Sequence, residues 1–300
     1  VYTDEFIWAR DYDIDLKVTY AINNYMVNPQ HANYAFTRQF IDTYLMTDGT
    51  PFTSKYPDYD DLDLVAECTD RDYRLAQTIR TPGFTRDGGT TQWAPDVKFS
   101  KTGYQPIKWL TDDSSKDTNV AAIASDVPLI RYAEVLLAYA EAKAELGEMS
   151  EEVWDKTIKP LRERAGVKSI YPTAADPYMV EYFQNQVTDP FILEVRRERG
   201  IELTMENSRY QDIIRWHQGE LFARPWKGVW ITANPKLQST LNILMIDGAS
   251  EAGHKLSRGT SGNILPSTAL ERKWQDYKYV KPIPTTARQE NPNLTQNPKW

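Results

Sequence analysis

The stretch from Ser125 to Gly147 constrains the fold of this chain more than any other part of the sequence. Ser125-Asp126-Val127-Pro128 offers a helix cap with proline in the first turn, and Leu129 to Leu146 is rich in Ala, Leu and Glu. The segment therefore predicts a helix that ends before Gly147. Its alternating alanines, at 138, 140, 142 and 144, allow a neighbour to approach closely, which favours a packed helical pair.

Two more helices follow on the same kind of signal. Ser150 is placed to cap a helix over Glu151 to Arg164, which would be the partner of the first. Asp189-Pro190 predicts the start of a third helix through about Glu206, continuing or kinking into Ser208 to His217. We therefore expect a helical core over residues 126–218.

The sequence on either side of this core is less regular. Residues 1–125 are expected to be a loop-rich part, with strands and loops more than helix before about Leu64. Residues 219–300 are punctuated by Pro and Gly and predict an extended, turn-rich tail. No repeat of about 34 residues is legible along the whole chain.

Charge and cysteine content exclude several classes of protein. The net charge of −7 disfavours nucleic acid as a partner, and the single cysteine, Cys68, can form neither an internal disulfide nor a multi-thiolate metal site. No stretch reads as a membrane span. Val1 to Arg10 lacks the features of a cleavable signal peptide, so the start resembles an internal cut.

Catalytic, metal and cofactor motifs are missing from the sequence. It has no nucleophile elbow, phosphate-binding loop, dinucleotide fingerprint or zinc-protease motif, and its three histidines are far apart. Asp11-x-Asp13-x-Asp15 resembles the start of a calcium loop, but Leu16 and Ile22 replace the glycine and glutamate that such a loop needs. We predict no catalytic residue, metal or cofactor. A carboxylate pair for glycoside hydrolysis remains open, because its two acids can lie anywhere in a chain.

The densest charged cluster runs from Glu198 to Arg215. Glu206, Arg209, Asp212 and Arg215 are spaced by three, so on one helix they would form a ladder of opposite charges. Placed between helices, the cluster would instead form a partly buried ion network. Either arrangement predicts a structural role.

This cluster, together with other motifs, closely resembles the SusD/RagB family. The main motifs are Arg131-Tyr132-Ala133-Glu134-Val135-Leu136-Leu137-Ala138-Tyr139-Ala140-Glu141-Ala142, Arg162-Glu163-Arg164-Ala165-Gly166-Val167, and Glu198-Arg199-Gly200-Ile201-Glu202-Leu203 followed by Glu206, Arg209, Asp212, Arg215 and Trp216. Supporting matches are Met46-x-Asp48-Gly49, Arg71-Asp72-Tyr73-Arg74-Leu75, Thr102-Gly103-Tyr104, Pro282-Ile283-Pro284, Asn291-Pro292-Asn293-Leu294 and Gln296-Asn297-Pro298.

The resemblance implies a mainly α fold of tetratricopeptide-like helix pairs, with long irregular loops and a few short strands. It implies a non-catalytic cell-surface lipoprotein of Bacteroidetes-type bacteria that captures glycan, or in some members peptide, and delivers it to a TonB-dependent SusC-like outer-membrane transporter. The family's lipidated N-terminal cysteine and early helix pairs have no counterpart here. We therefore expect the C-terminal portion of such a protein, with membrane association only through a lipid that this chain lacks.

Aromatic residues make up 12% of the sequence and suggest where a glycan would bind. Aromatic platforms and amide side chains suit a neutral sugar, and the charge-free stretch Val18 to Thr37 supplies both. From composition alone we predict ligand contacts at Tyr20, Tyr25, Tyr34, Trp93 and Trp109. The alternatives are a carbohydrate-active enzyme and a peptide-binding member of the same family.

Overall fold

The computed structural model describes residues 4–28, 34–118, 123–232, 243–246, 255–266 and 272–300. Two compact units make up the chain. The larger joins Val1–Thr204 to Trp226–Ser267, and the smaller joins Met205–Pro225 to Thr268–Trp300. No helix among the described residues is long and apolar enough to cross a membrane.

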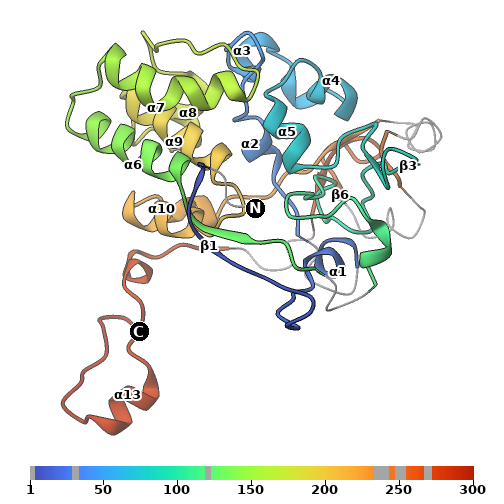
Figure 1. Cartoon of the computed structure of the whole chain (residues 1–300). Coiled ribbons are helices and arrows are strands. Elements are labelled where there is room, and N and C mark those ends of the chain that lie inside the picture. The colour runs from blue at the N-terminus through green and yellow to red at the C-terminus, as the bar shows by residue number, and fades with distance from the viewer. Residues whose placement is uncertain (1–3, 29–33, 119–122, 233–242, 247–254, 267–271) are drawn as a thin grey trace. The chain divides into compact units, whose positions relative to one another are not determined.

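Three long helices form the helical core of the larger unit: α6 (Tyr132–Glu145), α7 (Glu151–Arg164) and α9 (Pro190–Glu202), which lie together in Figure 1. The predicted Ser150 cap of α7 is confirmed, because its Oγ accepts a hydrogen bond from the Val153 amide at 3.3 Å. The core between these helices buries side chains of all three: Ala133, Leu137, Ala140, Ala144, Trp154, Ile158, Leu161 and Val195. Of the four alanines singled out in the sequence, Ala140 and Ala144 are buried at this interface, whereas Ala138 and Ala142 are exposed. Residues two apart on a helix point in different directions, so alternate alanines cannot all face one neighbour.

The first of these helices begins later than predicted. Val127–Arg131 is a strand, β4, which pairs antiparallel with β1 (Phe6–Arg10), and Arg131 is the residue that precedes α6. The predicted cap at Ser125 to Pro128 is therefore wrong. Pairing with a strand more than 100 residues away in the sequence overrides the local capping signal, and proline is tolerated in such an edge strand.

The third helix is shorter than predicted. It ends at Glu202, and Met205 and Asn207 then adopt left-handed backbone angles before α10 (Arg209–Arg215) begins in the smaller unit. The spaced charges from Glu198 to Arg215 consequently do not share one helix.

Short helices dominate the first part of the chain, where we had predicted mostly strands and loops. They are α1 (Ile22–Val27), α2 (Arg38–Ile41), α3 (Phe52–Lys55), α4 (Leu64–Cys68) and α5 (Tyr73–Thr78). Helices of one or two turns are unstable alone and too short to show a periodic pattern, so they depend on tertiary packing that the sequence does not display. Here that packing is a second apolar core around Ile41, Tyr44, Leu75 and Tyr104.

The remaining elements are short. A hairpin of β2 (Thr85–Arg86) and β3 (Thr91–Gln92) lies in the first part, and β5 (Trp230–Ile231), β7 (Gly262–Leu265) and β6 (Lys255–Leu256) form a three-stranded antiparallel sheet in that order. α8 (Pro177–Tyr182) precedes α9. The smaller unit holds α10 and α13 (Thr285–Glu290).

Candidate functional site

A buried ion network surrounds α9 and includes Glu198 and Glu202, which are the first members of the charged cluster noted in the sequence. Glu198 accepts hydrogen bonds from Arg74 of α5 at 2.5 Å and from Arg162 of α7 at 2.9 Å. Glu202 accepts from Arg74 at 2.8 Å and from Arg131 at 2.6 Å. Of the two arrangements predicted for the charged cluster, the ion network between helices is therefore the correct one for Glu198 and Glu202. Their side chains join α5, α7 and α9.

The guanidinium groups around Glu202 outweigh its burial. Burial alone would raise the pKa of this carboxyl, but Arg74, Arg131 and Arg164 hold it well below its usual range. In α10, Asp212 and Arg215 form a separate pair at 2.9 Å with i,i+3 spacing. All of these carboxylates are engaged in ion pairs, so they are poor candidates for ligand binding.

A second buried polar network lies between α2 and α4. Tyr104 donates to Glu67 at 2.8 Å, while Arg38 approaches Asp42 at 3.8 Å. Burial raises the pKa of Asp42 to about 8, with Arg38 opposing the shift and Glu67 adding to it. This shift favours the protonated form of Asp42 in the folded chain. Its 3% exposure keeps it away from any ligand.

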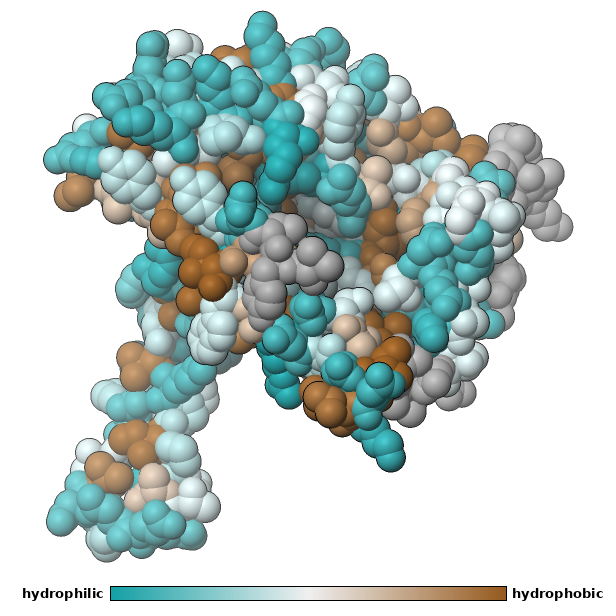
Figure 2. Space-filling model, in the orientation of Figure 1, coloured by the Kyte–Doolittle hydropathy of each residue, from teal (hydrophilic) through white to brown (hydrophobic). Residues whose placement is uncertain are grey.

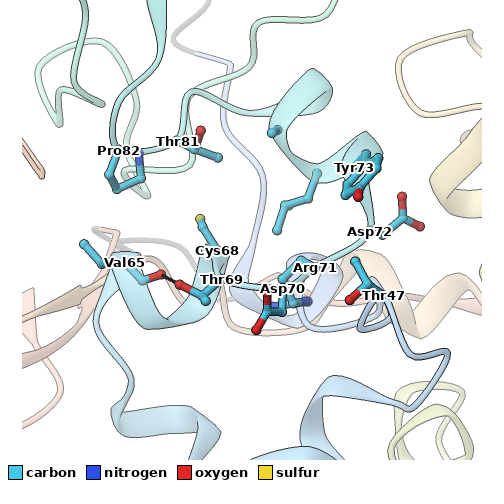
Figure 3. A pocket seen from close by; sticks show the side chains of 12 residues that line it. Thr47, Val65, Cys68, Thr69, Asp70, Arg71, Asp72, Tyr73, Thr81 and Pro82 are labelled. Carbon is cyan, nitrogen blue, oxygen red and sulfur yellow. Dashed lines mark hydrogen bonds between the residues drawn. The ribbon is translucent and has the colours of Figure 1, made fainter. Parts of the chain in front are cut away.

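The pocket shown in Figure 3 lies between α4 and α5 and has a volume of about 440 Å³. Val65 and Cys68 come from α4, Tyr73 from the start of α5, and Thr81 and Pro82 from the segment that follows α5. The other lining residues are Thr47, Thr69, Asp70, Arg71, Asp72, Leu75 and Ala76. The volume is in the range of small-molecule sites, and the lining mixes hydroxyls, carboxylates and apolar groups.

Tyr73 gives this pocket an exposed aromatic ring. The side chain is 59% exposed, and a Cβ atom placed on Gly166 would overlap the ring, so the ring rests directly against that glycine. The Tyr73 amide also donates to the Ala165 carbonyl at 3.0 Å. The ring is thus held in place while much of its surface stays open to solvent.

Asp70 and Arg71 each carry a polar side-chain group that is not paired with any described residue. Asp70 is exposed, has a left-handed backbone (φ 54°), and its carboxylate makes no hydrogen bond or ion pair with any described residue. Arg71 donates through both terminal nitrogens to carbonyls, but its buried Nε has no partner within the described ranges. Asp72, in contrast, is fully engaged as the cap of α5 and as the ion-pair partner of Arg74 at 2.6 Å.

Two kinds of reactive group can be checked at this pocket, a nucleophilic thiol and a metal site. Burial raises the pKa of the Cys68 thiol above its usual range, which keeps it protonated and unreactive. No group of His, Cys, Asp and Glu able to hold a metal occurs among the described residues. A planar ring beside a free carboxylate and several threonine hydroxyls can bind a polyhydroxylated molecule.

The five residues predicted from the sequence differ in how accessible they are. Tyr25 on α1 and Tyr34 are each 47% exposed. Tyr20 is half-buried, packs edge-on against Tyr12 with 4.6 Å between ring centroids, and donates from its hydroxyl to the Ser125 carbonyl at 3.1 Å. Two of the three tyrosines therefore present open rings.

The two tryptophans are half-buried. Trp93 has the guanidinium groups of Arg80 and Arg86 over its ring, 5.1 and 4.9 Å from the centroid. Trp109 has a left-handed backbone (φ 76°), and the Lys108 ammonium lies 5.9 Å from its ring. At least part of the Trp93 ring is thus covered by protein cations.

Buried hydrogen bonds place α1 beside the loops that carry the tryptophans. Asn23 donates to Thr111 at 2.8 Å and to Asp117 at 3.1 Å, and Asp117 in turn binds Arg86. Asn24 donates to the Asp117 carbonyl. These two asparagines are buried and paired, which corrects the idea that amides in Val18 to Thr37 face a ligand; Asn33 of that stretch lies outside the described residues.

The pocket residues were not predicted from the sequence. Arg71-Asp72-Tyr73-Arg74 had been noted as a family motif, but no sequence pattern shows that Tyr73 is exposed while both arginines are buried. The available signal was an aromatic residue at the first position of a short helix, which is too common to identify a site.

Comparison with known proteins settles the family. The sequence profile of the SusD family matches residues 4–300. "SusD-like protein P38" of Formosa agariphila is 26% identical over 219 residues, which are 67% of this chain and 39% of that protein. The chain belongs to the SusD family.

Solved structures agree with this assignment. A SusD-like protein of Bacteroides fragilis superposes with a TM-score of 0.64 at 21% identity, covering 99% of this chain and 54% of the other. A structure described as a SusD-like carbohydrate-binding protein from the same species gives 0.62 at 25% identity, covering 97% and 54%. The predicted SusD-like, mainly α fold is confirmed, and this chain spans about half the length of these relatives or less.

Proposed function

We propose that this chain is part of a non-catalytic cell-surface protein that captures a glycan and delivers it to a TonB-dependent SusC-like transporter of the outer membrane. The observation that carries the proposal is the family match over residues 4–300, together with the likeness to a solved relative described as carbohydrate-binding. In the full-length protein, a lipid anchor on a preceding segment would provide the attachment to the membrane.

The pocket between α4 and α5 supports glycan binding. Tyr73 offers a fixed and open ring for the C–H face of a sugar, and Asp70 offers a free carboxylate for a pair of hydroxyls. We propose Tyr25, Tyr34 and Trp109 as a further stacking surface, with Tyr20 and Trp93 in supporting positions. An extended glycan can use more than one such platform.

The alternative of a glycoside hydrolase is less well supported by the pocket. Such an enzyme needs two carboxyl groups about 5 to 9.5 Å apart, with one free to donate a proton. Asp70 and Asp72 line the pocket together, but Asp72 is held by Arg74 and by the cap of α5. A peptide-binding role is the other alternative, and the experiment below tests it directly.

The experiment is a glycan array combined with affinity gels, with released reducing sugar and a peptide library measured in parallel. We predict that Tyr73→Ala weakens binding of the glycan identified by about 1 to 3 kcal/mol, as loss of an aromatic platform does elsewhere. Tyr25→Ala tests the surface predicted from the sequence in the same way.

Tyr139→Ala is the matched control, because Tyr139 on α6 is 47% exposed, as Tyr25 is. It should leave the affinity unchanged. Enzyme-dependent release of sugar, or binding of peptides without any glycan, would contradict the proposal. Copurification of the full-length protein with an outer-membrane transporter tests the delivery step.

A further inference from the structure

Arg80, Arg86 and Trp93 form a compact cluster, of which only Trp93 belongs to the stacking surface proposed above. The two guanidinium groups lie over the Trp93 ring, and both arginines are buried, at 2% and 1% exposure. Trp93 is half-buried, so it is the member of the cluster with the most surface open to solvent. We call these three residues the donor cluster.

The donor cluster holds four buried N–H groups without an acceptor. They are Nε and Nη2 of Arg80, Nε of Arg86 and Nε1 of Trp93, and no described residue accepts a hydrogen bond from any of them. Guanidinium and indole groups can only donate. A buried donor left without a partner lowers the stability of the folded state by about 1 to 3 kcal/mol. Four such donor atoms close together therefore favour the binding of a group that accepts hydrogen bonds.

The charge of the cluster is only partly balanced. Arg86 is neutralised by Asp117, whose two oxygens lie 2.7 and 2.8 Å from its terminal nitrogens. The Arg80 side chain forms no ion pair with a described residue, and its one hydrogen bond to the described part of the chain goes to the Ala94 carbonyl at 3.2 Å. Burial, and then the charge of Arg86, lower the pKa of Arg80 to about 10, while Asp96 and Asp117 oppose this shift. Arg80 therefore remains a buried cation at neutral pH, with no bonded counterion among the residues that the structure describes.

The cluster is connected to the surface proposed for stacking. Asp117 binds Arg86 on one side and Asn23 of α1 on the other, and α1 carries the exposed Tyr25. A glycan lying on α1 and the neighbouring loops would thus lie close to the donor cluster.

We propose that the donor cluster binds an anionic oxygen group of the glycan, either the carboxylate of a uronic acid or a sulfate ester, so that the substrate is an acidic glycan. The inference rests on the proposed glycan-binding function and adds the class of substrate. A charged oxygen group accepts several N–H bonds at once and supplies the counterion that Arg80 lacks. In this role Trp93 acts as a hydrogen-bond donor and a support for the arginines.

Isothermal titration of the full chain with a matched set of sugars tests the inference. Methyl β-D-glucuronide and glucose 6-sulfate carry the two candidate groups, and methyl β-D-glucoside is their neutral counterpart. We expect at least one acidic sugar to bind about tenfold or more tightly than the neutral one, since hydrogen bonds to charged groups are worth this much. Arg80→Gln should abolish the difference.

Lys98→Gln is the control for a general effect of charge, because it removes one positive charge from an exposed position of the same loop. It should preserve the preference within about twofold, as expected for an exposed charge screened by salt. Equal binding of acidic and neutral sugars, an unchanged preference in Arg80→Gln, or an equal loss in Lys98→Gln would overturn the inference.

A second variant covers the case in which Arg80→Gln fails to fold. Trp93→Phe keeps both arginines and an aromatic ring but removes the indole N–H. It should weaken binding of the acidic sugar while sparing the neutral one; no change would again overturn the inference.

The outcomes distinguish this inference from the proposed function. If no polysaccharide binds on the array while Arg80-dependent binding of the glucuronide persists, only the proposed function is contradicted. If neutral glycans bind and acidity has no effect, only this inference fails.

Discussion

Glu198 is the residue whose substitution tests the buried ion network most directly. Its side chain is fully buried and bridges Arg74 and Arg162, at 2.5 and 2.9 Å. Breaking a buried ion pair by removing one partner typically costs about 3 to 5 kcal/mol. In Glu198→Gln both arginines keep another carboxylate, Asp72 for Arg74 and Glu194 for Arg162. We therefore expect the lower end of the range, about 3 kcal/mol.

That loss corresponds to a melting temperature lower by about 6 to 12 °C for a unit of this size. Thermal unfolding followed by circular dichroism measures it, with urea unfolding as a second measurement. Glu152→Gln is the control, because Glu152 and Lys156 of α7 form an exposed pair at the short distance of 2.6 Å, and its loss should produce no resolvable change. Similar melting temperatures for Glu198→Gln and Glu152→Gln would refute the reasoning that burial gives this network its importance.

Two further predictions concern buried and strained positions. The pKa of Asp42 is raised to about 8 in the folded chain, against about 3.9 when unfolded, so its stabilising contribution is present at low pH and is lost as pH rises towards 8. Asp42→Asn should therefore gain stability relative to the parent at pH 9 but not at pH 4, by urea midpoint; a gain independent of pH would contradict this assignment. Gly166 has φ +70° and lies against the Tyr73 ring, so Gly166→Ala should displace the ring and strain the backbone. Its glycan affinity should fall as in Tyr73→Ala, and an unchanged affinity would show that the ring position does not matter.

Local signals in the sequence correctly predicted those parts of the fold that are stabilised by contacts between residues close together along the chain. The Ser150 cap and the helix that follows it were predicted correctly, because a capping side chain acts within three residues. The strand β4 was missed because its partner β1 lies more than 100 residues earlier. The short helices α2, α4 and α5 were missed for a related reason, since they pack into an apolar core that they share with distant segments.

The candidate site was harder to predict than the fold. Composition indicated an aromatic surface, and Tyr25 and Tyr34 are exposed as such a surface requires. Composition does not show that Asn23 and Asn24 are buried against Asp117, nor that Trp93 lies beneath two guanidinium groups. These contacts join residues from 7 to 94 positions apart, and contacts of that kind leave no periodic pattern in a sequence.

The distribution of partners among buried charges separates structural from binding roles in this chain. Arg162 and Glu198 form an ion pair within the buried network, so their charges serve to hold α7 and α9 together. Asp70 and Arg80 carry charges that no described residue neutralises by an ion pair. Asp70 lines the pocket between α4 and α5, and Arg80 is buried. An unpaired buried charge lowers stability unless something else supplies its partner. Substitution of Glu198 should therefore reduce stability, whereas substitution of Arg80 should chiefly reduce the affinity for an acidic ligand.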